Sequence, residues 1–233
     1  MDAPIARQDW DEAERGLDAR GWTLLPRLLT AGQCAAAGGL WEAEKGFRSR
    51  IIMARHGFGE GEYRYFAYPL PALVAGLRER LYERLAPTAN RWAETLGSDM
   101  RFPERHADYL ARCHEAGQMR PTPLILRYEA GGYNALHQDL YGPHVFPIQA
   151  AILLSRPGED FEGGEFLLTE QRPRMQSRGT AVPLDQGDAV LFAVNHRPVR
   201  GTRGWYRTAM RHGVSTIRAG ERRTLGIIFH DAA

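Results

Sequence analysis

The sequence contains two His-x-Asp motifs, and only one of them is expected to form a metal site. They are His106-Ala-Asp108 and His137-Gln-Asp139. In a β-strand, residues i and i+2 lie on the same face, so a histidine and an aspartate at this spacing can bind one ion. In an α-helix the same two positions lie about 200° apart. His106 falls in a predicted helix and is interpreted as a surface or capping residue, whereas His137 follows a glycine turn and precedes a β region.

A metal site built on His137 and Asp139 needs a third ligand from a distant part of the chain. His212 and His196 are both candidates. Two histidines and one carboxylate leave the other coordination positions of an ion open, as in non-haem Fe(II) oxygenases. Arg222 lies ten residues after His212, where the final strand is expected to begin, and a guanidinium binds a carboxylate with two hydrogen bonds. The pattern therefore indicates an iron site with an organic acid beside it.

The elements that must position these residues differ between the two halves of the chain. Helical spacing predicts a mainly helical first half, with a short strand at 22–25, further short strands and loops within 47–69, and helices over 9–19, 31–46, 71–96 and 104–116. From residue 124 onward, short apolar segments between glycine and proline turns predict a sandwich or barrel. We therefore expect an α+β fold in a single domain, residues 1–233. Residues 1–117 would form mainly helical support and substrate-side elements, and residues 118–233 the catalytic core.

Charge is distributed unevenly along a chain of ordinary globular composition. The 233 residues have a formal net charge of +2 and are 43% hydrophobic, which excludes disordered, collagenous and coiled-coil classes. Residues 171–233 carry 11 basic and 4 acidic residues, against 19 and 24 in residues 1–170. Lys45 is the single lysine, so nearly all of this positive charge is arginine. A basic C-terminal quarter suggests an anionic ligand or partner.

Neither a membrane span nor an export signal is expected. No run of apolar residues approaches 18, and the N-terminal MDAPIARQDWDEAER has no apolar core. Cys34 and Cys113 are far apart and lack a CxxC partner, as is typical of free thiols in a reducing compartment. We therefore expect a cytoplasmic protein that does not contact a membrane.

Four ordered segments carry a resemblance to a known family. They are LRYEAGGYNALHQD, FEGGEFLL, VPLDQGDAVLF and HGVSTIRAGERRTLGIIF. Together they resemble the Fe(II)/2-oxoglutarate dioxygenase superfamily, and within it the prolyl-4-hydroxylase-like branch. The resemblance covers about residues 124–230, with a weaker match at GWTLLPRLLTAGQCAAA. The C-terminal half also resembles bacterial oxygenases linked to alkylated nucleic acid.

The resemblance implies a double-stranded β-helix, or jelly roll, with a helical N-terminal layer. It implies Fe(II), 2-oxoglutarate and O2, with ascorbate as a supporting reductant. The implied catalytic iron ligands are His137, Asp139 and His212, and Arg222 is implied to pair with the distal carboxylate of 2-oxoglutarate. Tyr128 matches a tyrosine that often binds this carboxylate. Thr224 shares a strand face with Arg222 and can assist, whereas Arg223 should point to the other face.

The resemblance leaves the substrate open. Hydroxylation or oxidative demethylation of an alkylated nucleic-acid base is one hypothesis, because the segment from Arg197 to Arg211 carries five arginines with Trp205 and Tyr206. The segment 192–211 is otherwise a solvated loop or a lid. Hydroxylation of a prolyl-type peptide or of a small metabolite is the alternative within the class, and a non-catalytic, metal- or ligand-binding β-barrel sensor is the alternative outside it. The candidate substrate residues are Tyr141, His144, His196 and Arg197.

Overall fold

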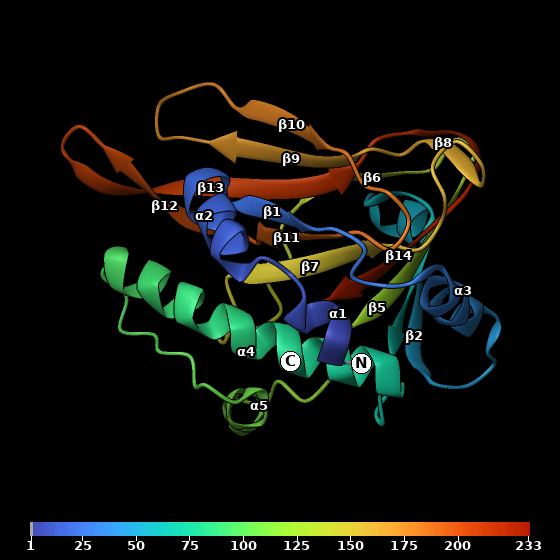
Figure 1. Cartoon of the computed structure of the whole chain (residues 1–233), viewed down its shortest axis with the longest axis horizontal. Helices are drawn as coiled ribbons and strands as arrows, with labels where there is room; N and C mark the ends of the chain where they lie inside the picture. Colours follow the sequence, from blue (N-terminus) through green and yellow to red (C-terminus); the bar gives the residue numbers. More distant parts are fainter. Residues whose placement is uncertain (1) are drawn as a thin grey trace.

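Two antiparallel sheets face each other, and helices cover the outer side of one of them (Figure 1). The computed structural model describes residues 2–233, so Met1 of the expected domain lies outside the described part. The helices are α1 (Asp2–Ala6), α2 (Trp10–Arg20), α3 (Ala31–Gly39), α4 (Ala72–Thr95) and α5 (His106–Glu115), with 3₁₀ turns at Leu40–Glu42 and Met53–His56. The expected mixture of helices and antiparallel strands is confirmed.

The larger sheet contains, in spatial order, β1 (Trp22–Leu25), β11 (Ala189–Ala193), β7 (Ile148–Leu153), β14 (Ile217–Ile227), β5 (Leu124–Glu129), β4 (Glu62–Phe66) and β2 (Phe47–Ile52), with β8 (Phe161–Gly163) paired to β14. The smaller sheet contains β10 (Arg178–Val182), β9 (Phe166–Gln171), β13 (Gly204–Val214), β6 (Tyr133–His137) and β3 (Gly59–Glu60), with β12 (His196–Gly201) paired to β13. From β5 onward the chain passes repeatedly between the two sheets, which is the connectivity of a jelly roll.

Local capping signals define the ends of the N-terminal helices. The side chain of Asp9 accepts a hydrogen bond from the backbone of Glu12 at 2.9 Å, and α2 ends at Gly21 in the left-handed conformation. Thr30 and Gln33 form a reciprocal capping box at the start of α3. Helix α3 is shorter than predicted, because the chain tightens into a 3₁₀ turn after Gly39.

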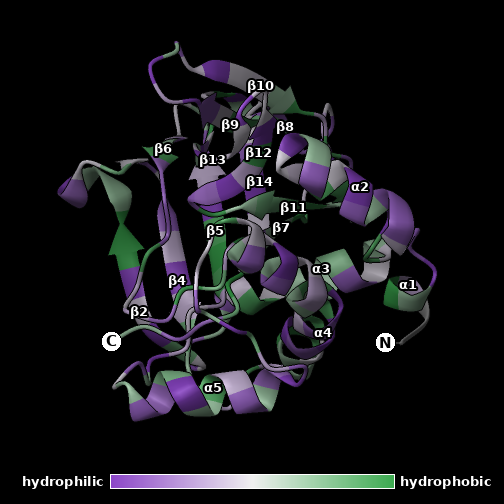
Figure 2. Cartoon of the chain, turned by 90° about the vertical axis from the view of Figure 1, so that its left-hand side faces the viewer, coloured by the Kyte–Doolittle hydropathy of each residue, from purple (hydrophilic) through white to green (hydrophobic). Residues whose placement is uncertain are grey.

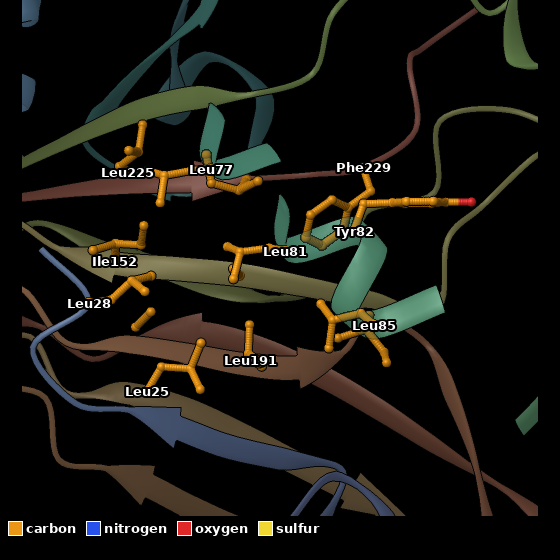
Figure 3. Close-up of a cluster of buried hydrophobic side chains, with 14 of the residues drawn as sticks. Leu25, Leu28, Leu77, Leu81, Tyr82, Leu85, Ile152, Leu191, Leu225 and Phe229 are labelled. Carbon is orange, nitrogen blue, oxygen red and sulfur yellow. The ribbon is translucent and has the colours of Figure 1, made fainter. Parts of the chain in front are cut away.

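The main hydrophobic core lies between α4 and the outer face of the larger sheet. Figure 3 shows leucines of α4 pointing at side chains of β1, β7, β11 and β14; the labelled residues are Leu25, Leu28, Leu77, Leu81, Tyr82, Leu85, Ile152, Leu191, Leu225 and Phe229. This cluster joins residues from both 1–117 and 118–233. Helices α2, α4 and α5 alternate hydrophilic and hydrophobic bands (Figure 2), as expected for helices that bury one face.

His106 belongs to this packing and is not a surface residue. It is the first residue of α5, is buried, and its Nε2 lies 2.8 Å from the carbonyl oxygen of Phe229. The expectation of an exposed position is therefore wrong. No helix within residues 2–233 is long and apolar enough to cross a membrane.

The segment between Phe192 and His212 forms a β-hairpin. Strands β12 and β13 pair from His196 opposite Ala209 to Gly201 opposite Gly204, and the hairpin projects beyond the sheets at the left of Figure 1. Arg197 is 2% exposed, and its Nη2 lies 2.7 Å from Glu170 of β9. The hairpin is therefore anchored at its base by a buried ion pair.

Candidate active site

His137, Asp139 and His212 converge between the two sheets. His137 ends β6, and His212 lies directly opposite it on β13 in the antiparallel ladder. One potential ligand atom from each of the three side chains lies within 4.8 Å of the others. Two imidazoles and one carboxylate in this arrangement match the donor set of a non-haem Fe(II) centre, so the residues present fit the metal.

The surroundings of the three side chains favour metal binding. The ring of His137 donates from Nδ1 to the carbonyl of Ala135 at 2.7 Å, which leaves Nε2 free. Burial, together with the charge of His137, lowers the pKa of His212, so its ring is neutral at neutral pH. Burial alone would raise the pKa of Asp139, but the hydrogen bond with His212 and the electrostatic influence of the two neighbouring histidines lower it far below its usual range. A neutral His212 ring and an ionised Asp139 carboxylate are the protonation states that bind a cation.

Two neighbouring side chains orient the carboxylate of Asp139. The hydroxyl of Tyr141 donates to Oδ1 at 2.6 Å, and Nε2 of Gln149 donates to Oδ2 at 2.8 Å. Tyr65 in turn donates to the hydroxyl of Tyr141 at 3.0 Å. The carboxylate therefore holds a fixed orientation toward the histidines.

Arg222 is a buried cation on the opposite sheet. It is 1% exposed, donates to the hydroxyl of Thr224, and has no acidic partner in an ion pair within the described chain. Its Nε has no hydrogen-bond partner there either. Burial lowers the pKa of Arg222 to about 10, so it remains charged at neutral pH. A buried charge without a counter-ion is costly, so this position fits an anionic ligand.

Tyr128 completes this side of the site. It lies opposite Arg222 in the β5–β14 ladder and is fully buried. Burial raises its pKa, so the phenol stays protonated. Its oxygen accepts a hydrogen bond from Asn134 at 3.2 Å, which leaves its own proton available for an acceptor. Arg223, by contrast, bonds the carbonyl of Gly38 outside the sheet, as the strand alternation predicts.

A cavity of about 360 Å³ joins the two groups of residues. His137, Asp139 and His212 line one wall, and Arg222, Thr224 and Tyr128 line another. Tyr141, one of the candidate substrate residues, also lines the cavity. An anion on Arg222 and a metal on the triad would therefore share one enclosed space.

Three of the substrate candidates lie outside this cavity. His196 is exposed on β12, and its backbone N–H bonds the side chain of Asn195. Arg197 is committed to its ion pair with Glu170. The backbone of His144 bonds the side-chain amide of Gln118 at both N–H and carbonyl. Of the two rivals for third ligand, His212 and not His196 therefore lies beside Asp139.

Sequence reasoning missed Gln149. It is the one polar side chain in the apolar run PIQAAILL, and this isolation is the signal that would have found it. Along β7, Ile148, Ala150 and Ile152 join the main core, so Gln149 faces the opposite side, toward the cavity.

Solved structures with the same fold are Fe(II)/2-oxoglutarate oxygenases. A prolyl-4-hydroxylase of Pseudomonas putida superposes with a TM-score of 0.55 at 14% identity, covering 93% of this chain and 96% of the other. A 2OG-Fe(II) oxygenase-family oxidoreductase of Burkholderia pseudomallei superposes with a TM-score of 0.56 at 18% identity, covering 97% of this chain and 94% of the other. A prolyl hydroxylase of Trichoplax adhaerens, in complex with a peptide fragment of hypoxia-inducible factor, superposes with a TM-score of 0.58 at 11% identity. The superposition covers 96% of this chain and 89% of the other. These likenesses establish the double-stranded β-helix.

The fold, the candidate metal site and a match to an oxygenase family together define the class, a non-haem Fe(II)/2-oxoglutarate-dependent oxygenase. A protein of Mycobacterium tuberculosis named as uncharacterized, found in two strains, is 53% identical over 168 residues, which cover 72% of each chain. Residues 61–232 match the model of the Oxygenase-NA family, described as "Oxygenase, catalysing oxidative methylation of damaged DNA", and the chain belongs to this family. Membership of an enzyme family argues against the non-catalytic sensor.

Proposed function

We propose that this oxygenase removes alkyl groups from damaged bases of single-stranded DNA. The observation that carries the proposal is the β12–β13 hairpin, whose base carries the metal-site residue His212. Its exposed arginines form no ion pair with any residue in 2–233; they are Arg200, Arg203, Arg207 and Arg211. Unpaired arginines are suited to contact phosphates, and they set the salt dependence of nucleic-acid binding. The description of the family supports the same substrate class.

Trp205 strengthens this interpretation of the hairpin. It is 55% exposed and lies directly opposite Arg200 in the ladder, so the two side chains share a face. Arg207 and Arg211 follow at even spacing on the same face of β13. An exposed indole among guanidinium groups is suited to stack an unpaired base while neighbouring phosphates are neutralised.

In this proposal the triad His137, Asp139 and His212 holds Fe(II), and Arg222 pairs with the distal carboxylate of 2-oxoglutarate. Tyr128 and Thr224 support that carboxylate through their hydroxyl groups. Iron with 2-oxoglutarate and O2 supplies the oxidation of a C–H bond, with succinate and CO2 as co-products. Hydroxylation of an N-methyl carbon gives a hemiaminal, which releases formaldehyde and leaves the nitrogen unmethylated; the hydroxyl proton is transferred to that nitrogen or, from a cationic base such as N3-methylated cytosine, is released. The protein residues orient the reactants and keep water out of the cavity.

The direct test measures formaldehyde and succinate with single-stranded oligonucleotides that carry either one N-methylated base or none. Formaldehyde is expected only from the methylated strand, with Fe(II), 2-oxoglutarate and ascorbate present. His212→Ala should abolish it, and His196→Ala should not. Formaldehyde-free turnover on a prolyl peptide or a small metabolite would contradict the proposal and favour those alternatives.

The hairpin is tested by salt-dependent DNA binding. Arg203→Gln/Arg211→Gln should reduce the slope of log K against log salt by about 1.4, for two lost phosphate contacts on a single strand. The matched control is Arg15→Gln/Arg156→Gln, which removes the same charge from arginines paired with Glu12 and Asp160. Equal slopes for the two double variants would show that the hairpin does not contact the strand.

A further inference from the structure

Gln149 presents a buried hydrogen-bond acceptor to the active-site cavity. The residue is 4% exposed and lies on β7 opposite Phe192. Its oxygen Oε1 has no hydrogen-bond donor among the residues that the structure describes. A buried side-chain amide normally makes hydrogen bonds through both its nitrogen and its oxygen. An amide oxygen that faces a cavity without a donor therefore indicates that a ligand supplies the donor.

The chemistry of Asp139 fixes which way the amide of Gln149 points. The carboxylate oxygens of Asp139 act as hydrogen-bond acceptors, as the bond that Tyr141 donates to Oδ1 at 2.6 Å shows. The NH2 group must therefore face Oδ2 of Asp139, at 2.8 Å. A flipped amide would set two acceptors against each other, so Oε1 is held away from the carboxylate.

Neither the metal nor the cosubstrate supplies the missing donor. At neutral pH 2-oxoglutarate carries only acceptor oxygens, and Arg222, Thr224 and Tyr128 on the other wall are suited to receive it. The hydroxyl of Tyr141 is already committed to Oδ1 of Asp139. The donor that Oε1 requires must therefore belong to the molecule that is oxidised, or to water in its place.

We infer that Gln149 selects the substrate by accepting a hydrogen bond from an amino group adjacent to the alkylated nitrogen of the base. The inference rests on the proposed function, because it assumes that a damaged base occupies the cavity. Bases with an amino group on the modified edge, such as 3-methylcytosine, satisfy Oε1. The equally shaped 3-methyluracil presents a carbonyl there, which sets two acceptors against each other. Sites built to bind a donor discriminate strongly against analogues that lack it.

The test is equilibrium binding without turnover. Fluorescence anisotropy is measured without oxygen, with Mn(II) and 2-oxoglutarate, on single strands containing 3-methylcytosine, 3-methyluracil or no modification. The wild-type protein is expected to prefer 3-methylcytosine over 3-methyluracil by about 10-fold or more. Gln149→Met keeps the volume of the side chain but removes the acceptor, so this preference should disappear. The two bases differ in charge, and this difference affects their affinities equally in both proteins. Its effect therefore cancels when the ratio of the two affinities is compared between the wild type and Gln149→Met.

Tyr141→Phe is the matched control, because it removes the other hydrogen bond to Asp139 and leaves Oε1 of Gln149 in place. It should change Mn(II) affinity, read by electron paramagnetic resonance, without changing the base preference. An unchanged preference in Gln149→Met would overturn the inference alone and leave Gln149 as a positioning residue for Asp139. Equal binding of methylated and unmodified strands by the wild type would overturn the proposed function and, with it, this inference.

Discussion

Arg78 and Arg222 are both 1% exposed, yet their surroundings are opposite. Arg78 lies on α4, and its Nη2 is 2.7 Å from the carboxylate of Asp231. Its Nε donates to the carbonyl of Ile228, its Nη1 donates to the hydroxyl of Tyr68, and Nη2 also donates to the hydroxyl of Thr122. Arg222 has the hydroxyl of Thr224 as its hydrogen-bond acceptor and has no carboxylate partner within residues 2–233.

The difference separates a charge that is neutralised inside the fold from one that has no carboxylate partner within residues 2–233. Asp231 neutralises Arg78, and together they attach the C-terminal residues to α4. Arg222 lines a cavity and lacks a counter-ion, so its charge is available to a ligand. Burial alone would not have distinguished the two residues; the presence or absence of an internal anion does.

The largest effect is expected when Arg78 is removed. Arg78→Met leaves the carboxylate of Asp231 buried without its cation, and breaking a buried pair in this way costs about 3–5 kcal/mol of unfolding free energy. Urea denaturation of the variant and the wild type measures the loss. Arg223→Met removes a neighbour of Arg222 whose ion pairs with Glu42 and Glu221 are partly exposed, and it should cost about 1 kcal/mol or less. Equal losses for the two variants would contradict the structural role of Arg78.

Arg222→Met should lower ligand affinity rather than stability. Losing the partner of a buried ligand carboxylate costs about 2–5 kcal/mol of binding free energy, so calorimetry with Mn(II) should show 2-oxoglutarate binding weakened by about 30-fold or more. The ligand-free variant should unfold at the same or a higher urea concentration than the wild type, because an unpaired buried charge has been removed. Destabilisation as large as that of Arg78→Met would make Arg222 a structural residue as well.

A smaller, gradual loss of stability is expected when the pH is lowered, because two histidines near Arg78 resist protonation in the folded protein. Burial, followed by the charge of Arg78, lowers the pKa of His106 to about 3 and that of His230 to about 4. Below about pH 6.5 the two histidines bind protons in the unfolded chain but stay neutral in the folded protein. Protonation therefore favours unfolding, and the free energy of unfolding decreases as the pH falls from about 6.5 to 4. Each ring contributes up to about 1.4 kcal/mol per pH unit to the slope of the unfolding free energy against pH.

His106→Gln isolates one of these contributions. Urea unfolding at several pH values should give a shallower slope for the variant than for the wild type, since glutamine has no proton to gain. Parallel curves would mean that His106 titrates equally in both states. Arg222→Met should leave this slope unchanged, because the charged groups that act on His106 are Arg78 and Asp231.

Local signals in the sequence predicted part of the fold and part of the candidate metal cluster. Glycine turns and short apolar segments predicted a sandwich or barrel, and the spacing of His137 and Asp139 predicted that they share a strand face. Strand alternation also predicted that Arg222 and Thr224 share a face and that Arg223 does not. The jelly roll, which the solved structures confirm, and His212 as the third residue of the cluster were implied by the family resemblance. The division at residue 117 and the roles of the site residues stay predictions.

Other features of the structure depend on contacts between residues far apart in the sequence, which local sequence patterns do not encode. The position of His106 in a predicted helix indicated a surface or capping residue, but Phe229 and Tyr82 from other elements bury it. The arginines from 197 to 211 were treated as one group, although strand alternation separates buried Arg197 from its exposed neighbours. Gln149 was missed because its meaning depends on Asp139, which is near only in the folded chain.

The pairing of His212 with His137 and with Leu168 has a consequence for how the protein can vary. A slip of one residue in this ladder would turn His212 away from the cavity, so backbone register selects the side chains of the metal cluster. Residues 202–203 lie beyond the last paired positions of the β12–β13 hairpin. Insertions or deletions at this tip therefore change how far the hairpin reaches while the metal cluster keeps its register. Under the proposed function, the hairpin that would contact nucleic acid and the candidate metal cluster can therefore change independently in evolution.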